Sequence, residues 1–283
     1  MYQLRAPAPD LLPFIEHYWF VTSKPEKPVE LQVDVFVDAR ADLIINLGAP
    51  YLREVIGGET REVGYSNLDA QRLLPIRIIQ RGMVATSGVR FHLGGLGAFS
   101  NVPLRGITNA TVPPAEVFGA GADALEELLS KATDVDAQAA LFDAFFLERL
   151  KRATSFETFQ KALQAAVESN GTATVEDMAQ AAGITGRQVD RLCARYLGIA
   201  PKTLSRVVRF QTALKALMRD PGCTLAEVAA NAGYFDQAHF IKDFRQMTGG
   251  VPRGYRGYYP PEGPNDFAPN VVVFLQDRKR ARE

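Results

Sequence analysis

The feature that most constrains this chain is an internal repeat in its C-terminal part. Residues from Thr174 onward match residues from Thr224 onward at an offset of 50, which becomes 51 after one inserted residue. The matched positions of the first copy are Thr174, Val175, Asp177, Met178, Ala179, Ala182, Gly183, Thr185, Val189, Arg191, Cys193, Gly198 and Pro201. Because the insertion falls in a predicted turn, the pattern indicates two copies of one structural unit.

Each copy predicts two helices joined by a tight turn. In the first copy a short helix ends at Gly183, since glycine tolerates the positive φ of a helix C-terminus. Thr185 is a suitable N-cap for the next helix, and Asp236 takes the same place in the second copy. Two helices in this arrangement form a helix-turn-helix, whose second helix enters the major groove of DNA.

The second helix of each copy has an apolar and a polar side. The predicted buried residues are Val189, Leu192, Cys193 and Tyr196 in the first copy and Phe240, Phe244 and Met247 in the second. The predicted outward residues are Arg187, Arg191 and Arg195 in the first copy and Gln237, Ala238, His239 and Lys242 in the second. One charged face alone is usually the solvated side of a helical domain. The duplicated turn, the caps and the outward faces together favour DNA binding.

A single helix is predicted to connect the two copies. Pro201 begins it, an apolar face runs along it, and Asp220-Pro221-Gly222 ends it. Its roughly 19 residues would span about 28 Å at about 1.5 Å per residue. With the width of the units added, this length suits two recognition helices in successive major grooves, about 34 Å apart.

The net charge of zero hides an asymmetry that agrees with nucleic-acid binding. Residues 1–160 carry 15 Lys and Arg against 20 Asp and Glu, whereas residues 161–260 carry 13 against 8. An acidic first part joined to a basic second part keeps nucleic acid among the expected partners. Two cysteines, Cys193 and Cys223, and the lack of a long apolar run predict a cytoplasmic protein without disulfides.

With these units in place, residues 155–259 resemble the DNA-binding domain of the AraC/XylS family of bacterial transcription regulators. The resemblance covers both helix-turn-helix units and the connecting helix. It includes the closing pattern G-x-x-P-x-x-Y-R, which runs here from Gly249 to Arg256. The sequence departs from common members at Gly186, Cys193 and Phe235.

The resemblance also implies which residues contact DNA. It implies base contacts from Arg187, Asp190, Arg191, Gln237, Ala238, His239 and Lys242, with Gln188 near the DNA backbone. Arginine reads guanine in the major groove, and a carboxylate can accept from cytosine. Outside these positions, the residues expected to contact phosphates are Arg195, Arg206, Arg209 and Arg253.

The part before residue 154 predicts a different kind of domain. Short β-rich runs separated by Gly and Pro occur at 18–22, 31–37, 43–48, 76–79 and 84–93, followed by helical patterns at 122–131 and 136–152. We therefore expect an α+β chain: a β-barrel or cupin-like domain with flanking helices at 1–153, then an all-α domain at 154–259. Ser155 is a candidate N-cap for the first helix of that second domain. A tail at 260–283 contains a spacer at 260–264, a strand-like run at 271–275 and a basic end. We expect the strand to dock on the N-terminal domain; the alternative for the last seven residues is a solvated basic end that touches DNA.

The N-terminal domain resembles a less studied sensory domain of these regulators, on HYWFV at 17–21, DLIINLG at 42–48 and GVRFHLGGLGAF at 88–99. Such a domain implies a small-molecule effector or a dimerisation role. The candidate ligand contacts are Tyr18, Trp19, Phe36, Asn46, Arg90 and Phe91, with Arg90 as an anion anchor. The alternative is that most of these residues are core, since a tryptophan in a strand more often packs than lines a pocket.

The sequence gives little support for an enzyme. It has three histidines, His17, His92 and His239, and no phosphate-loop motif or clustered ligand set. We predict no catalytic residue, metal or cofactor. The expected partners are double-stranded DNA, RNA polymerase and a small-molecule effector, with a homodimer left open. The alternatives are a constitutive regulator whose first domain only dimerises, and a small-molecule-binding enzyme with a tethered helical domain.

Overall fold

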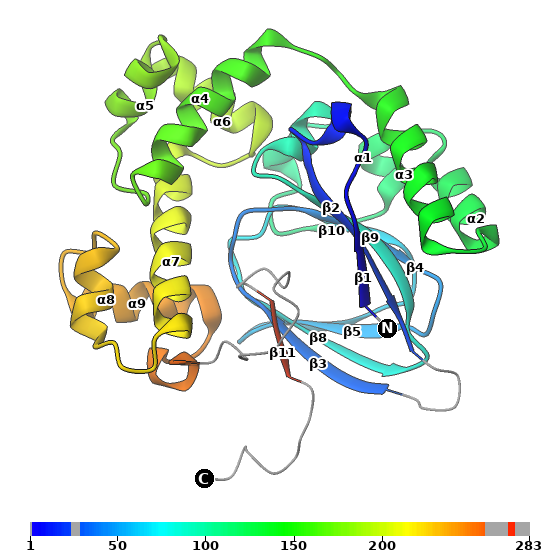
Figure 1. The fold of residues 1–283 in the computed structure, drawn as a ribbon, viewed down its shortest axis with the longest axis horizontal. Helices are drawn as coiled ribbons and strands as arrows, with labels where there is room; N and C mark the ends of the chain where they lie inside the picture. Colours follow the sequence, from blue (N-terminus) through cyan, green and yellow to red (C-terminus); the bar gives the residue numbers. More distant parts are fainter. Residues whose placement is uncertain (1, 24–28, 258–270, 275–283) are drawn as a thin grey trace.

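The N-terminal part contains two antiparallel sheets and three helices, and the part that follows is mainly helical (Figure 1). The computed structural model describes residues 2–23, 29–257 and 271–274. The first sheet has the strand order β1-β2-β9-β4-β7-β10, and the second has the order β11-β3-β8-β5-β6. The strands are β1 (Tyr2–Arg5), β2 (Ile15–Thr22), β3 (Val29–Val35), β4 (Asp42–Asn46), β5 (Tyr51–Val55), β6 (Thr60–Val63), β7 (Asn67–Asp69), β8 (Ile76–Gly82), β9 (Ala85–Phe91), β10 (Thr111–Val112) and β11 (Val271–Phe274).

The sequence-based class, α+β, is confirmed, but closure into a barrel is not, because the described strands pair within two separate sheets. All five strand runs predicted from the sequence exist. The short strands β1, β5, β6, β7 and β10 were not predicted. In the central β2-β9-β4 group, β4 is buried at every residue and β9 at most of its residues, so both strands are buried on both faces. In β2, buried and partly exposed residues are mixed.

Three helices cover the first sheet: α1 (Pro114–Phe118), α2 (Ala122–Lys131) and α3 (Val135–Arg149). Phe142 of α3 packs against Tyr18 of β2 with ring centroids 5.1 Å apart. Phe146 meets Phe91 of β9 and Phe99 edge-on, at 5.5 and 4.9 Å. The aromatic side chains that recur along α3 therefore serve as its packing face against the sheet. Four 3₁₀ turns, η1 (Pro9–Leu11), η2 (Gly95–Ala98), η3 (Leu104–Gly106) and η4 (Pro252–Tyr255), complete the described elements.

The C-terminal helices are arranged in two groups joined by one long helix (Figure 1). The first group is α4 (Thr154–Glu168), α5 (Val175–Ala182) and α6 (Gly186–Tyr196), and the second is α8 (Leu225–Asn231) and α9 (Gln237–Thr248). Between them runs α7 (Pro201–Arg219), whose 19 residues agree with the predicted connector. The N-cap predicted at Ser155 is wrong, because α4 begins one residue earlier and the Ser155 hydroxyl bonds to that of Tyr196 at 2.7 Å.

The helical part packs directly on segments of the N-terminal domain that lie outside its strands. At one end, a β-carbon on Gly97 of η2 would lie 2.8 Å from Cα of Tyr196, so only glycine allows this approach of α6. At the other end, the Val37 amide donates to the Met247 carbonyl of α9 at 3.3 Å, and Phe36 meets Tyr255 edge-on at 5.3 Å. Each second helix of the repeat thus ends against the N-terminal domain.

After the helices, β11 pairs antiparallel with β3, so that Val271 lies opposite Val35. The spacer predicted at 260–264 and the basic end lie outside the described residues. Within the parts of the chain that the structure describes, no helix is both long and apolar enough to cross a membrane.

Candidate nucleic-acid interface

The two copies of the repeat fold alike down to their capping bonds. Thr174 accepts a hydrogen bond from the Asp177 amide at 3.1 Å, and Thr224 accepts one from the Glu227 amide at 3.2 Å. In each copy the acidic side chain bonds back to the threonine amide at 2.8 Å, which completes a capping box. After each short helix comes a glycine with positive φ, +66° at Gly183 and +75° at Gly233. Both units are therefore helix-turn-helix motifs of the same construction.

In the first unit, α6 presents its arginines to solvent. The predicted cap is confirmed, since Thr185 accepts from the Gln188 amide at 3.3 Å while Gln188 Oε1 accepts from the Thr185 amide at 2.9 Å. The predicted buried face is also confirmed, and it holds Val189, Leu192, Cys193 and Tyr196. Arg187, Asp190, Arg191 and Arg195 are exposed. Burial raises the pKa of the Cys193 thiol to about 12, so this cysteine is held neutral in the core.

In the second unit, α9 begins at the predicted cap, because Asp236 accepts from the His239 amide at 2.7 Å. Phe240, Phe244 and Met247 are buried as predicted. Gln237, Ala238 and Lys242 are exposed, whereas His239 is half-buried with its ring edge-on to Tyr234. The sequence reasoning did not name Arg245 and Gln246, which are also exposed on α9. Arg245 and Gln246 follow Lys242 by three and four positions, which places all three on one side of the helix, so helical spacing could have predicted their exposure.

Of the arginines expected to contact phosphates, Arg206 and Arg209 are bonded to other parts of the protein, whereas Arg253 is exposed. Arg206 of α7 bonds to Asp243 of α9 at 2.8 Å and also to Gln246. The hydrogen bond to Asp243 is the main reason why the pKa of Arg206 is raised. Arg209 donates to the Gly171 carbonyl at 3.0 Å, while Arg253 is exposed on η4. Arg206 and Arg209 therefore also hold the helices together.

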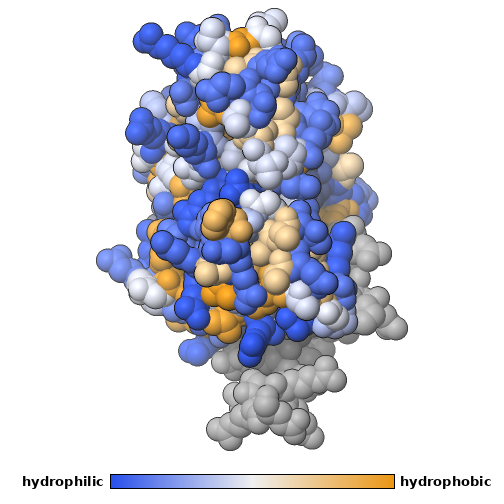
Figure 2. All heavy atoms as spheres, turned by 90° about the vertical axis from the view of Figure 1, so that its left-hand side faces the viewer, coloured by the Kyte–Doolittle hydropathy of each residue, from blue (hydrophilic) through white to orange (hydrophobic). Residues whose placement is uncertain are grey.

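Hydrophilic side chains cover most of the helical side of the molecule, and hydrophobic ones gather there in a few patches (Figure 2). The buried stripes of α6 and α9 face inward, so the polar residues of both helices lie on the surface. A surface of this composition can donate and accept hydrogen bonds at base edges and phosphates.

The residues predicted to bind a small molecule are mostly enclosed. Tyr18, Phe36 and Phe91 are fully buried, and the Tyr18 hydroxyl donates to Asp143 at 2.8 Å. Asn46 bonds to the carbonyl of Ala49 at 3.1 Å, and Trp19 is half-buried. A hollow of about 320 Å³ beside α2 and one of about 460 Å³ between α2 and α3 contain none of the six residues.

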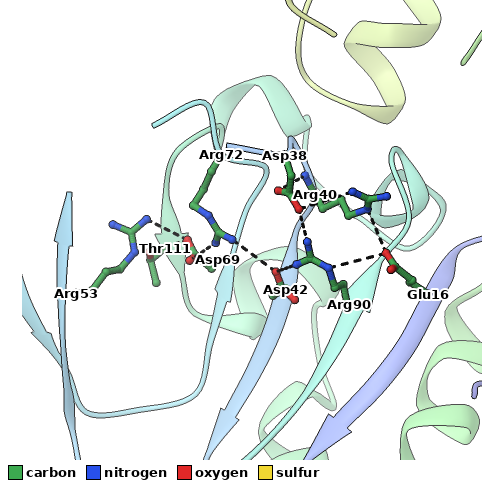
Figure 3. A network of polar contacts seen from close by, with 9 residues as sticks. All are labelled: Glu16, Asp38, Arg40, Asp42, Arg53, Asp69, Arg72, Arg90 and Thr111. Atoms are coloured by element: carbon green, nitrogen blue, oxygen red, sulfur yellow. Dashed lines mark hydrogen bonds and ion pairs between the residues drawn. The ribbon is translucent and has the colours of Figure 1, made fainter. Parts of the chain in front are cut away.

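Arg90, the predicted anion anchor, lies in a chain of charged residues, most of which are buried (Figure 3). It bonds to Asp42 at 2.7 Å and, by a second ion pair, to Asp38. The chain continues in two directions through Arg40–Glu16 at 3.1 Å, Arg72–Asp42 at 3.6 Å, Arg72–Asp69, and Arg53–Asp69 at 3.1 Å. Burial acts to raise the pKa of Asp38, but Arg90 and Arg40 outweigh it and hold that pKa below its usual value. This network was not predicted from the sequence, because most of its pairs join residues far apart in the chain, such as Arg90 with Asp42 and with Asp38.

Comparison with known proteins covers both parts of the chain. Residues 178–258 match a family described as a helix-turn-helix domain, and residues 3–113 match a domain of unknown function, DUF6597. The C-terminal unit is an AraC-type helix-turn-helix domain. No curated protein matches the chain.

Among solved structures, the chain is similar to ToxT from Vibrio cholerae O395, with 8% identity and a TM-score of 0.45 over 81% of this chain and 96% of ToxT. It is also similar to an AraC-type regulator from Chromobacterium violaceum, with 22% identity and a TM-score of 0.36 over 39% of this chain and 100% of that one. A probable AraC family regulator from Rhodopseudomonas palustris has 24% identity and a TM-score of 0.32, over 35% of this chain and 94% of its own.

Proposed function

We propose that this protein is a sequence-specific, DNA-binding transcription regulator that reads two successive major-groove segments. The observation that carries the proposal is the duplicated helix-turn-helix with exposed polar second helices, joined by the 19 residues of α7. A helix of that length spans about 28 Å at about 1.5 Å per residue. With the units attached at its ends, one chain can address two sites about one helical turn of DNA apart.

The exposed residues divide into base and backbone contacts. On α6, Arg187 and Arg191 are one turn apart and suit guanine, while Asp190 between them can accept from cytosine. On α9, Gln237, Ala238 and Lys242 take the corresponding role, with His239 at the edge. Gln188 uses its side-chain oxygen for the cap, so its amide nitrogen makes the DNA backbone contact.

Phosphate contacts then come from arginines at the margins of the two units. Arg195 and Arg253 are exposed and suit this role directly. Arg206 and Arg209 combine it with the internal bonds that fix α7 against its neighbours.

The N-terminal domain supplies control in this proposal. It touches the C-terminal end of α6 through Gly97 and that of α9 through Val37, so a change in the domain reaches both helices. A small-molecule effector acts if it binds one arrangement of the two domains more tightly than another. RNA polymerase is the expected protein partner. In the alternative, the domain only mediates homodimerisation and the regulator is constitutive.

The base-reading role is tested by removing one arginine at a time. Arg187→Ala and Arg191→Ala each are expected to weaken specific binding by roughly 1–3 kcal/mol and to relax the preference at one base pair. The matched control is Arg105→Ala, since Arg105 is exposed on η3 of the N-terminal domain. Competition binding with single-base variants of the site gives both quantities. Unchanged specific affinity in both α6 variants would rule out reading by the first unit.

A further inference from the structure

The turn before α9 holds the most exposed large hydrophobic side chain among the described residues. Phe235 is 93% exposed, whereas the next such residue, Tyr65, is 58% exposed. Phe235 directly precedes Asp236, the N-cap of α9. A phenylalanine exposed to this extent offers apolar surface that a bound partner can bury.

The backbone identifies Phe235 as the residue inserted between the two copies of the repeat. The Ile184 amide donates to the Ala179 carbonyl at 3.0 Å, and the Tyr234 amide donates to the Ala229 carbonyl at 2.9 Å. Ile184 and Tyr234 are therefore equivalent positions. Thr185 follows Ile184 as the cap of α6, but Phe235 comes between Tyr234 and the cap of α9. The first unit has no counterpart of this side chain.

The residues on both sides of Phe235 keep the contacts of a helix-turn-helix turn, so α9 begins at its cap despite the inserted residue. Tyr234 is 5% exposed and packs against Phe240 at a centroid distance of 5.3 Å. Gly233 supplies the positive φ, and Asp236 makes its capping bond. The insertion therefore adds an apolar group beside the first turn of a recognition helix and leaves the helix in place.

The first turn of a recognition helix is the part that meets base edges in the major groove. The one apolar group displayed there is the C5-methyl of thymine, which aromatic and other apolar side chains contact. Ala238, exposed in the first turn of α9, adds to the apolar character, while Gln237 and Lys242 keep the surroundings polar. These polar neighbours favour a DNA groove, where they can bond to base edges and phosphates beside the apolar contact.

We propose that Phe235 contacts a thymine methyl in the DNA segment read by α9, and so gives the second unit a preference for an A·T pair. This inference rests on the proposed function, because it requires α9 to lie in a major groove. The first unit reads with charged side chains, and the second adds an apolar contact that the first lacks.

The test is a coupling measurement on a binding site mapped with the wild-type protein. Each thymine of the site is replaced in turn by deoxyuridine, which lacks only the methyl group. Affinities are measured for the wild type, Phe235→Ala, and the control Leu128→Ala, in which an exposed leucine of α2 is removed. We expect one thymine in the second half-site whose replacement weakens wild-type binding about four-fold. This factor corresponds to the burial of about one methylene-sized group. The same replacement is expected to have no effect on Phe235→Ala.

The outcomes separate the inference from the proposed function. If deoxyuridine weakens wild type and Phe235→Ala equally at every position, the contact does not exist. If Phe235→Ala binds DNA like the wild type but loses transcription in a purified system, Phe235 contacts polymerase and the inference is wrong. If the wild type has no specific site at all, the proposed function itself fails.

Discussion

Replacing Arg90 by methionine tests whether the buried charge network is a structural element of the N-terminal domain. Arg90 bonds to Asp38, whose side chain is 0% exposed, and to Asp42, whose side chain is 12% exposed. Methionine keeps much of the length and removes the charge, so two buried carboxylates lose their main partner. Removing one member of a buried ion pair costs about 3–5 kcal/mol. Since whole domains are stable by about 5–15 kcal/mol, the expected loss is a large fraction of the total.

The assay uses the single tryptophan of the chain, Trp19, as a probe. Trp19 lies in β2 opposite Gly88 of β9, the strand that carries Arg90, so its fluorescence follows unfolding of this sheet. Urea titrations give the free energy of unfolding for the wild type, Arg90→Met and the control Arg152→Met. Arg152 and its partner Asp10 are 69% and 58% exposed, so this pair is expected to contribute only about 0–1 kcal/mol.

Two further observations complete this test. Arg90→Met combined with Asp38→Asn removes a charge together with its partner and is expected to recover part of the lost stability. If Arg90→Met is no less stable than Arg152→Met, the reasoning is refuted. Arg90 would then be available to hold an anionic ligand.

Three other predictions concern the same molecule. The pKa of Asp38 is lowered in the folded state. The ionised Asp38 carboxylate therefore stabilises the fold fully above the unfolded pKa of about 4, and this stabilisation is lost as the pH falls through the lower, folded pKa. In Asp38→Asn the free energy of unfolding should fall less steeply at acid pH than in the wild type. In the native protein a thiol reagent should modify Cys223, which is half-buried, and leave the enclosed Cys193 unmodified until urea is added; equal rates for both would contradict the packing of α6. Deleting residues 266–283 removes β11 and uncovers the edge of β3, which should lower the free energy of unfolding by about 1–2 kcal/mol; an unchanged midpoint would mean that the pairing contributes nothing.

The helical part could be predicted from the sequence because its signals are local. Thr185 and Asp236 are caps by virtue of residues three positions away, and Gly183 marks a helix end by its own conformational freedom. Because the sequence pattern occurs twice, the second copy independently supported the helices and turn predicted from the first. Helical spacing predicted the outward arginines of α6 and the exposed Gln237, Ala238 and Lys242 of α9, whereas Arg245 and Gln246 were not named and His239 is half-buried.

The interior of the N-terminal domain could not be predicted in the same way. Arg90 and Asp38 are 52 positions apart and meet only because β9 and the segment after β3 are brought together by the two sheets. A sequence read along one strand shows Arg90 as an isolated charge, which suggested an anion site. Short strands such as β7 have too few residues for their alternation to be recognised. Phe235 was noticed as a departure from the family pattern, but its exposure could be known only from the structure.

Specific DNA binding is the central claim, and one titration tests it most directly. Purified full-length protein is bound to a labelled fragment from upstream of its own gene, in competition with a scrambled fragment, at salt concentrations from about 50 to 200 mM. We expect a site preferred over the scrambled competitor. For the four arginines expected at phosphates, the affinity should fall by about 10² over that range, from a log–log slope of about −0.9 per contact. Weak binding that does not distinguish the two fragments, with or without candidate effectors, would contradict the account.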